Sequence, residues 1–174
     1  TEDYDSYFDI WAWNDLNQQS TTASFGWRRY YHAIYIANYI IENQNKITEA
    51  TQDEISQLVG EAYMMRAYCH FLLVNLYADA YTHCNPATTR GIPLSLEANV
   101  NNVLTCSSVK QVYQQVIADI KEAKTRLKVA VWDEGYTYRF NQISADALLA
   151  RVYLYKGDWQ DALGEAKEIG RAHV

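Results

Sequence analysis

The chain contains few of the residues that interrupt helices. Among its 174 residues are only two prolines and seven glycines. A fold built from many short strands needs these residues at its turns, so their scarcity disfavours a β-sandwich or a β-barrel. Hydrophobic residues make up 49% of the chain and charged residues 21%, a composition typical of one globular domain with a sizeable core. Long helices are therefore expected.

Long apolar runs and basic clusters are also absent from the sequence. The most apolar stretch, residues 71–77, is far shorter than the roughly 18 residues that cross a bilayer, so we expect any membrane attachment to lie outside this chain. The formal net charge is -6 and the basic residues are scattered, which disfavours nucleic acid as a partner. The sequence has no initial methionine, signal peptide or lipid-attachment cysteine, and we expect a fragment of a longer protein.

The three cysteines do not form a metal-binding motif such as C-x-x-C, so neither a metal site nor a cofactor is expected. Cys69 falls on the apolar face of a predicted helix, which indicates a buried thiol. Cys84 and Cys106 flank a polar loop and leave two alternatives open. In an oxidising compartment they could close a loop of about 22 residues and stabilise the fold by about 3 kcal/mol; otherwise they are free thiols.

Aromatic residues are abundant, with 15 Tyr, five Trp and four Phe, or 14% of the chain. Tyr and Trp pack with one edge and meet polar groups with the other, which suits both helix stacking and sugar binding. Residues 1–26 hold several of them without a sustained period, so this segment is predicted to be mostly irregular and to cover another surface.

Two helices are predicted over residues 27–79. Apolar residues at spacings of three and four predict the first helix from Trp27 to about Asn43. Thr51 and Glu54 have the spacing of a capping box, which predicts the start of the second helix. Its apolar face continues to Leu76, so a helix of this length needs partners along its whole extent.

Residues 80–107 are predicted to form an inserted loop, because Pro, Gly and Asn interrupt the helical period there. A loop longer than the usual connection between helices is often functional or contacts a partner. The third helix is predicted to start at Ser107 or Ser108, where Gln111 would complete another capping box.

Two shorter helices are predicted to end the chain as a tight hairpin. Ser144 is the expected N-cap of the first, with Ile143 and Leu148 as its hydrophobic staple. Gly157 is expected to end this helix and Asp158 to cap the next.

The hairpin resembles a tetratricopeptide repeat, with small residues at helix crossings and bulky ones between them, although Asp146 departs from the pattern. One repeat cannot bury its own apolar face, so the second and third helices are expected to form a further, divergent unit. The predicted fold is all-α: a short α-solenoid of tetratricopeptide-like hairpins with long loop insertions. The residues that carry the resemblance are Leu149, Ala150, Tyr153, Gly157, Ala162 and Ala166.

Four segments, in order, resemble the SusD/RagB family of outer-membrane nutrient-binding lipoproteins. They are W-R-R-Y-Y-H-A-I with A-N (27–38), G-E-A-Y-M-M-R-A-Y continuing to L-Y-A-D (60–79), R-G-I-P-L (90–94), and the hairpin from A-L-L-A-R-V-Y-L onward (147–166).

This resemblance implies that residues 1–174 are a single N-terminal helical domain, divided into 1–26, 27–79, 80–107 and 108–170. It implies a lipid-anchored protein at the cell surface of the outer membrane. Its role would be noncatalytic capture of a glycan or oligosaccharide for polysaccharide utilisation. The partners would be that glycan and a SusC-like TonB-dependent transporter.

The segment that we expect to bind ligand is Trp11, Trp13, Asn14, Asp15 and Asn17. If the W-A-W run is extended, both indoles face one side and can cover a sugar ring, while the amides and the carboxylate orient its hydroxyls. The segment is similar to an aromatic and Asn stretch that contributes to starch binding in the founding member of the family. Alternatively, the two tryptophans seal the helical scaffold.

Other functions have weaker support in the sequence. A helical-repeat module that binds a protein or peptide is the main alternative. A glycosidase needs two carboxyl groups opposed across a cleft, which the adjacent acidic pairs do not provide, so we predict that the protein is not an enzyme. Arg66 and Arg151 are predicted to form structural ion pairs with carboxylates such as Asp79 or Asp146.

Overall fold

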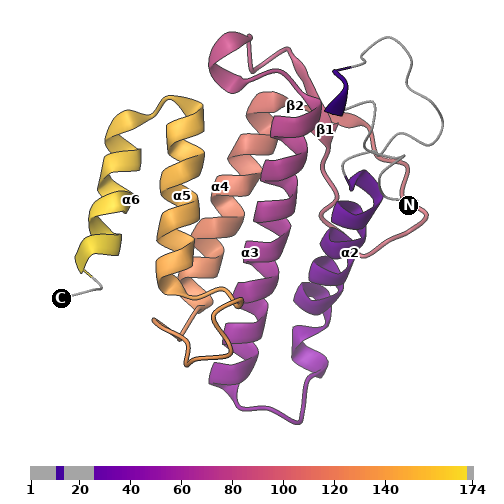
Figure 1. Ribbon diagram of the computed structural model, residues 1–174. Coiled ribbons are helices and arrows are strands. Elements are labelled where there is room, and N and C mark those ends of the chain that lie inside the picture. The colour runs from indigo at the N-terminus through magenta and orange to yellow at the C-terminus, as the bar shows by residue number, and fades with distance from the viewer. Residues whose placement is uncertain (1–10, 14–25, 172–174) are drawn as a thin grey trace.

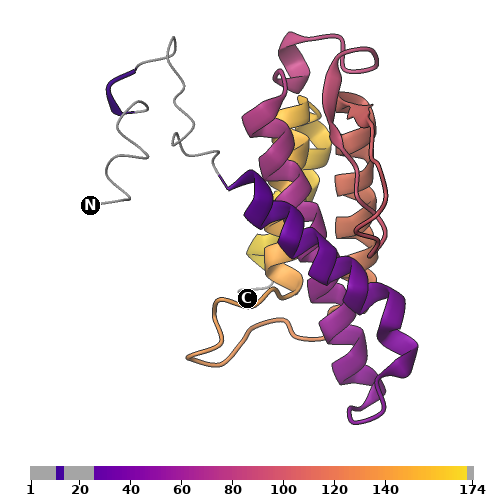
Figure 2. The same cartoon turned by 90° about the vertical axis from the view of Figure 1, so that its right-hand side faces the viewer.

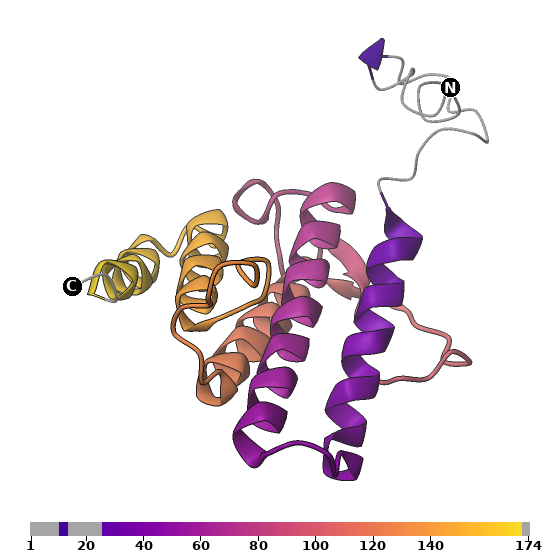
Figure 3. The ribbon, with the colours of Figure 1, turned by 60° about the horizontal axis from the view of Figure 1, so that its bottom comes forward.

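The structure is a computed structural model that describes residues 11–13 and 26–171. Helices dominate it, as predicted. Helix α3 packs against both α2 and α4. Helix α4 in turn packs against α5, and α5 against α6 (Figures 1 and 3). The all-α prediction is confirmed. The helices are α2 (Trp27–Asn43), α3 (Gln52–Tyr77), α4 (Val109–Arg126), α5 (Gln142–Lys156) and α6 (Trp159–Arg171), with short 3-10 helices η1 (Gln44–Lys46) and η2 (Tyr81–His83).

The core lies between α3, α4 and α5. The apolar face of α3 contributes Met64 and Leu73, α4 contributes Val116 and Ile120, and α5 contributes Leu149, all of them fully buried. Because α3 packs against neighbours on two sides, its buried residues are not confined to one stripe. These contacts explain the length of α3. The two hairpins expected from the repeat pattern are formed by α3 with α4 and by α5 with α6.

Two of the predicted helix starts are confirmed in detail. The Thr51 hydroxyl accepts a hydrogen bond from the Glu54 backbone N–H, and the Glu54 carboxylate accepts one from the Thr51 backbone N–H at 2.8 Å. Ser108 and Gln111 repeat this arrangement at the start of α4. Each box satisfies backbone donors that the first turn of a helix leaves unpaired.

The predicted start of α5 is wrong by three residues. Its N-cap is Asn141, and Ser144 lies inside the first turn. The Asn141 side-chain oxygen accepts from the Ser144 N–H at 2.8 Å, while the Ser144 hydroxyl accepts from the Asn141 N–H at 2.8 Å. Both residue types are good caps, and here Asn141 occupies the N-cap while Ser144 supplies the other side chain of the same box. Gly157 ends α5 with a φ of 87°, as predicted.

The inserted segment contains two short strands that the sequence did not reveal. Strands β1 (Arg90–Pro93) and β2 (Cys106–Ser108) pair antiparallel. Strands of three and four residues are too short to show a period of two. A Cβ atom on Gly91 would lie 2.9 Å from the Ser107 carbonyl oxygen, so only glycine allows the two backbones to approach this closely.

A buried ion pair joins α3 to α4. The Arg66 guanidinium donates to both carboxylate oxygens of Asp119, at 2.8 and 2.6 Å, and to the side-chain oxygen of Asn38 on α2 at 2.9 Å. Gln115 donates a further hydrogen bond to Asp119. The predicted structural role of Arg66 is confirmed. Its partner, however, is Asp119 and not Asp79 or Asp146, because α4 lies against this face of α3.

The other proposed ion pairs differ from expectation. Asp146 pairs with Lys124 at 2.7 Å. Arg151 is exposed and does not occur among the salt bridges between the described residues.

Replacing Asp119 by alanine should lower the free energy of unfolding by about 3–5 kcal/mol, because the Arg66 charge would stay buried without its partner. Chemical denaturation followed by circular dichroism measures the change. Lys128→Ala is the control, since Lys128 and Asp53 form an exposed pair at 3.6 Å that contributes about 0–1 kcal/mol. A loss of equal size in both variants would contradict the assigned role.

Gly91→Ala should destabilise the protein by about 1–3 kcal/mol, because the new methyl group would press on the backbone of β2. Gly164→Ala is the matched control, since a Cβ atom there meets no atom within 4 Å and alanine favours the helix by about 0.5–1 kcal/mol. Thermal unfolding of the two variants should therefore shift in opposite directions.

Candidate functional site

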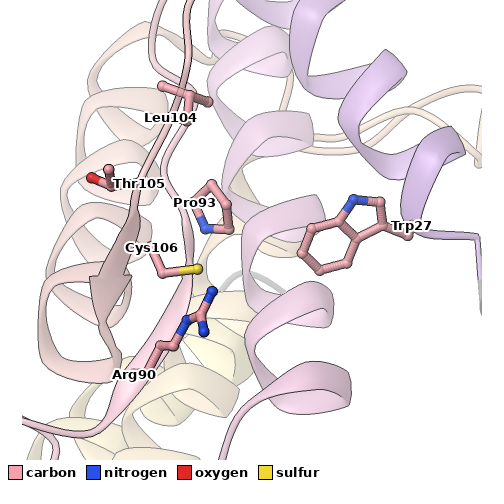
Figure 4. Close-up of a pocket in the computed structure, with 6 residues that line it drawn as sticks. All are labelled: Trp27, Arg90, Pro93, Leu104, Thr105 and Cys106. Atoms are coloured by element: carbon pink, nitrogen blue, oxygen red, sulfur yellow. The ribbon is translucent and has the colours of Figure 1, made fainter.

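A pocket of about 600 Å³ opens between the start of α2 and the strand pair β1–β2. Figure 4 shows the Trp27 ring on one side of it and the residues of the strands and their connection on the other. The lining consists of Trp27, Arg90, Pro93, Leu104, Thr105 and Cys106.

Trp27 forms the aromatic wall of the pocket. It is the first residue of α2 and follows Gly26, whose φ is 76°. Its ring centroid lies 4.9 Å from that of Tyr31 and 4.7 Å from that of Tyr77, the latter in an edge-to-face arrangement. These contacts fix the orientation of the indole, which remains partly accessible from the pocket.

The opposite wall carries a cation and a thiol. The guanidinium of Arg90 points toward the Cys106 sulfur (Figure 4), and the hydrogen bond between them raises the pKa of Arg90. Cys84 and Cys106 are both free thiols, so the alternative in which they form a disulfide is wrong. Cys69 is buried, as predicted.

The segment that follows β1 is held in place by side chains of α2. The Tyr31 hydroxyl donates to the Pro93 carbonyl oxygen at 2.7 Å, and burial raises the pKa of this hydroxyl. The Asn38 amide donates to the carbonyl oxygens of Ser95 and Glu97, each at 3.1 Å. Asn38 also accepts from Arg66, so the buried ion-pair network extends to the segment that follows Pro93.

His70 on α3 holds the same segment through a hydrogen bond to its backbone. Its Nε2 atom accepts a hydrogen bond from the Ser95 backbone N–H at 3.4 Å. Burial, and secondly the charge of Arg66, lower the pKa of His70 to about 3. The imidazole is therefore neutral at physiological pH and can act as an acceptor.

The structure tests the conformation, but not the ligand-binding role, of the predicted aromatic segment. Trp11 and Trp13 are 74% and 92% exposed, so the described part of the chain does not bury them as the sealing alternative requires. Asn14, Asp15 and Asn17 lie outside the described residues.

The W-A-W run is not extended, so the condition that would place both indoles on one side is not met. Trp11 is helical, while Ala12 and Trp13 lie in a turn, and Trp13 has a φ of 55°. The Asn and Asp residues that follow favour turns over strands. The lining of the pocket at Trp27 does not include Trp11 or Trp13, so the described residues form this pocket without the predicted segment.

The sequence pointed to the pocket residues only as parts of the scaffold. Trp27 was assigned to the apolar face of a helix, and Arg90 to the R-G-I-P-L motif. Their approach depends on the packing of β1 against α3 and α4, which no local pattern indicates. The motif itself was the available signal, because its glycine and proline imply a backbone held in a special position.

Residues 2–154 match the family described as "Starch-binding associating with outer membrane", a SusD-like family. The chain belongs to this SusD-like family. A SusD-like protein of Formosa agariphila is 31% identical over 153 residues, which cover 86% of this chain and 26% of that protein.

Solved structures of SusD-like proteins have the same fold. A SusD superfamily protein from Bacteroides thetaiotaomicron is 26% identical with a TM-score of 0.80 and covers 92% of this chain and 35% of its own. A laminarin-binding SusD-like protein is 27% identical with a TM-score of 0.70 and covers 82% of this chain and 29% of its own. This SusD-like chain thus spans about a quarter to a third of the length of these relatives.

Within residues 11–13 and 26–171, none of the helices is both long and apolar enough to cross a bilayer. The same residues hold no cluster of three or more His, Cys, Asp or Glu side chains that could bind a metal ion.

Lowering the pH from 7 to 5 should destabilise the protein through His70. The pKa of His70 is about 3 in the fold against an ordinary value of 6.5, so the unfolded chain takes up the proton first. Stability is complete above pH 6.5 and falls toward pH 3, by about 2 kcal/mol at pH 5.

Urea denaturation at the two pH values measures this loss. His70→Gln keeps a hydrogen-bond acceptor but cannot be protonated, so its loss between pH 7 and 5 should be smaller by about 2 kcal/mol. His32→Ala, at an exposed position, should leave the wild-type dependence unchanged.

Proposed function

We propose that this SusD-like protein captures a glycan or oligosaccharide at the outer-membrane surface, without catalysis, and delivers it to a SusC-like TonB-dependent transporter. The observation that supports this most directly is the pocket in which the Trp27 indole lies across from the wall that carries the Arg90 guanidinium. The family description and the similarity to a laminarin-binding protein agree with a carbohydrate ligand. A lipid anchor beyond these residues would hold the protein at the cell surface.

The chemistry of the pocket suits a sugar. An indole can cover the C–H face of a pyranose ring, while a guanidinium such as that of Arg90 orients its hydroxyl groups. A sugar face that buries about 100 Å² of apolar surface contributes roughly 2.5 kcal/mol, whereas millimolar affinity requires about 4 kcal/mol. One indole is therefore not sufficient. We propose Trp11, Trp13, Asn14, Asp15 and Asn17 as further ligand-binding residues.

The pocket gives no support to glycoside hydrolysis. That reaction requires two carboxyl groups about 5–10 Å apart on either side of the glycosidic bond. The described residues that line the pocket include neither Asp nor Glu. Binding without catalysis is accordingly the function that this site favours.

A peptide-binding module has less support. A second hollow, of about 290 Å³, lies between α2 and α3, where a helical-repeat protein could hold a peptide. Peptide backbones are held by amide and basic side chains, and the lining of this hollow is apolar apart from one carboxylate. The lining residues are Ala33, Ile36, Ala37, Ile40, Leu58, Glu61, Ala62 and Met65.

Calorimetry of the full-length protein with a panel of soluble polysaccharides that includes starch and laminarin should identify at least one ligand. Trp27→Ala, Trp11→Ala and Trp13→Ala should each weaken its binding by about 10- to 100-fold, the equivalent of one lost sugar platform. Arg28→Ala is the control, since Arg28 is the exposed residue next to Trp27 and does not line the pocket.

Each outcome of this experiment bears on a different part of the proposal. Unchanged binding in the Trp27 variant would exclude the pocket, and unchanged binding in both N-terminal variants would exclude the predicted segment. Failure of the wild-type protein to bind any glycan would contradict carbohydrate capture itself.

A further inference from the structure

The connection between α4 and α5, residues 128–141, exposes aromatic side chains at the end of the helices opposite β1 and β2. This aromatic loop lies at the lower ends of the helices in Figure 1 and projects away from them in Figure 2. Tyr136 is 52% exposed and Tyr138 is 79% exposed. Rings in these positions contribute little to the stability of the fold, because most of their apolar surface stays in water.

The base of the aromatic loop is nevertheless fixed by one buried side chain of α3. The Gln57 side-chain oxygen accepts hydrogen bonds from the backbone N–H groups of Lys128 at 2.7 Å and Val129 at 3.1 Å. The amide of the same Gln57 donates to the Phe140 carbonyl oxygen at 3.2 Å. Gln57 thus joins the incoming and outgoing arms of the loop.

An ion pair and an indole ring hold the part of the loop that lies beyond this base. The Arg139 guanidinium donates to both carboxylate oxygens of Glu61 on α3, at 2.7 and 3.1 Å. It also lies 4.0 Å above the Trp132 ring, whose N–H donates to the Phe140 carbonyl oxygen at 2.9 Å. A two-point ion pair and a stacked cation hold this indole in one orientation.

Two turns then order the tip of the loop. The Tyr136 N–H donates to the Asp133 carbonyl oxygen at 3.1 Å, across Gly135, whose φ is 97°. The Arg139 N–H donates to the Tyr136 carbonyl oxygen at 3.0 Å. The Tyr136 ring lies 6.2 Å from the Trp132 ring. The exposed rings are therefore presented by an ordered backbone, which reduces the entropy lost when a ligand binds.

We propose that the aromatic loop is a second carbohydrate-binding surface that takes a neutral oligosaccharide. The Tyr136 and Tyr138 rings offer apolar faces for sugar C–H groups, while the exposed Asp133 and Glu134 carboxylates beside them accept hydrogen bonds from sugar hydroxyls. These carboxylates repel acidic or sulfated sugars, and Arg139 already pairs with Glu61. The charge around the rings accordingly selects a neutral ligand.

This inference rests on the proposed function, because it assumes that the protein binds glycans. The test uses the full-length protein and the neutral polysaccharides starch and laminarin, with affinity electrophoresis as the measurement. The double variant Tyr136→Ala/Tyr138→Ala should weaken binding to the preferred glycan by about tenfold or more. The Tyr136→Phe/Tyr138→Phe variant keeps the ring faces and should retain affinity within about threefold.

Tyr39→Ala is the matched control, since Tyr39 is an equally exposed tyrosine on α2, and it should leave binding unchanged. Circular dichroism should show that all three variants fold. Unchanged glycan binding in the Tyr136→Ala/Tyr138→Ala variant would overturn the second surface while carbohydrate capture by the rest of the protein stands.

Two further outcomes would also overturn the proposal. If the double variant binds glycan normally but no longer co-purifies with the transporter, the aromatic loop is a protein contact. If the wild-type protein binds neither these nor other glycans, the second surface fails together with the proposed function.

Discussion

The buried pair of Arg66 and Asp119 is the interaction on which the described helices depend. Two charges removed from water cost several kcal/mol each, and only complete hydrogen bonding offsets that cost. Arg66 meets this requirement with Asp119 and Asn38, and Asp119 with an additional bond from Gln115. Helices α2, α3 and α4 are joined at one point as a result. Asn38 continues the network to the segment after β1, so the chain that leaves the pocket residue Pro93 is held by the same network that joins these helices.

Both candidate binding surfaces follow one structural plan. In each, polar side chains of α2 or α3 hold the backbone of a connecting segment: Asn38 and His70 beside the pocket, and Gln57 at the base of the aromatic loop. These bonds replace the backbone pairing that a sheet would provide. The aromatic loop can then display rings that the core does not need, because its own order does not depend on burying those rings.

Local patterns predicted much of the scaffold and little of the sites. The capping boxes at Thr51 and Ser108 and the end of α5 at Gly157 were found because each depends on residues only a few positions apart. The partner of Arg66 was missed because it is 53 residues away, and the strands β1 and β2 were too short to show a period. The pocket at Trp27 and the braced aromatic loop arise from long-range packing, and the N-terminal pattern did not determine the turn at Trp13.

The length of helix α3 also sets the distance between the two candidate binding surfaces. Tyr77, which contacts Trp27, ends this helix, while Gln57 lies near its start and braces the aromatic loop. Twenty residues at about 1.5 Å each separate these points by roughly 30 Å along a rigid rod. If both proposed surfaces bind glycan, a sugar of a few units cannot reach from one to the other, whereas a polymer chain could occupy both at once. Such bridging would raise the avidity for long chains over short ones.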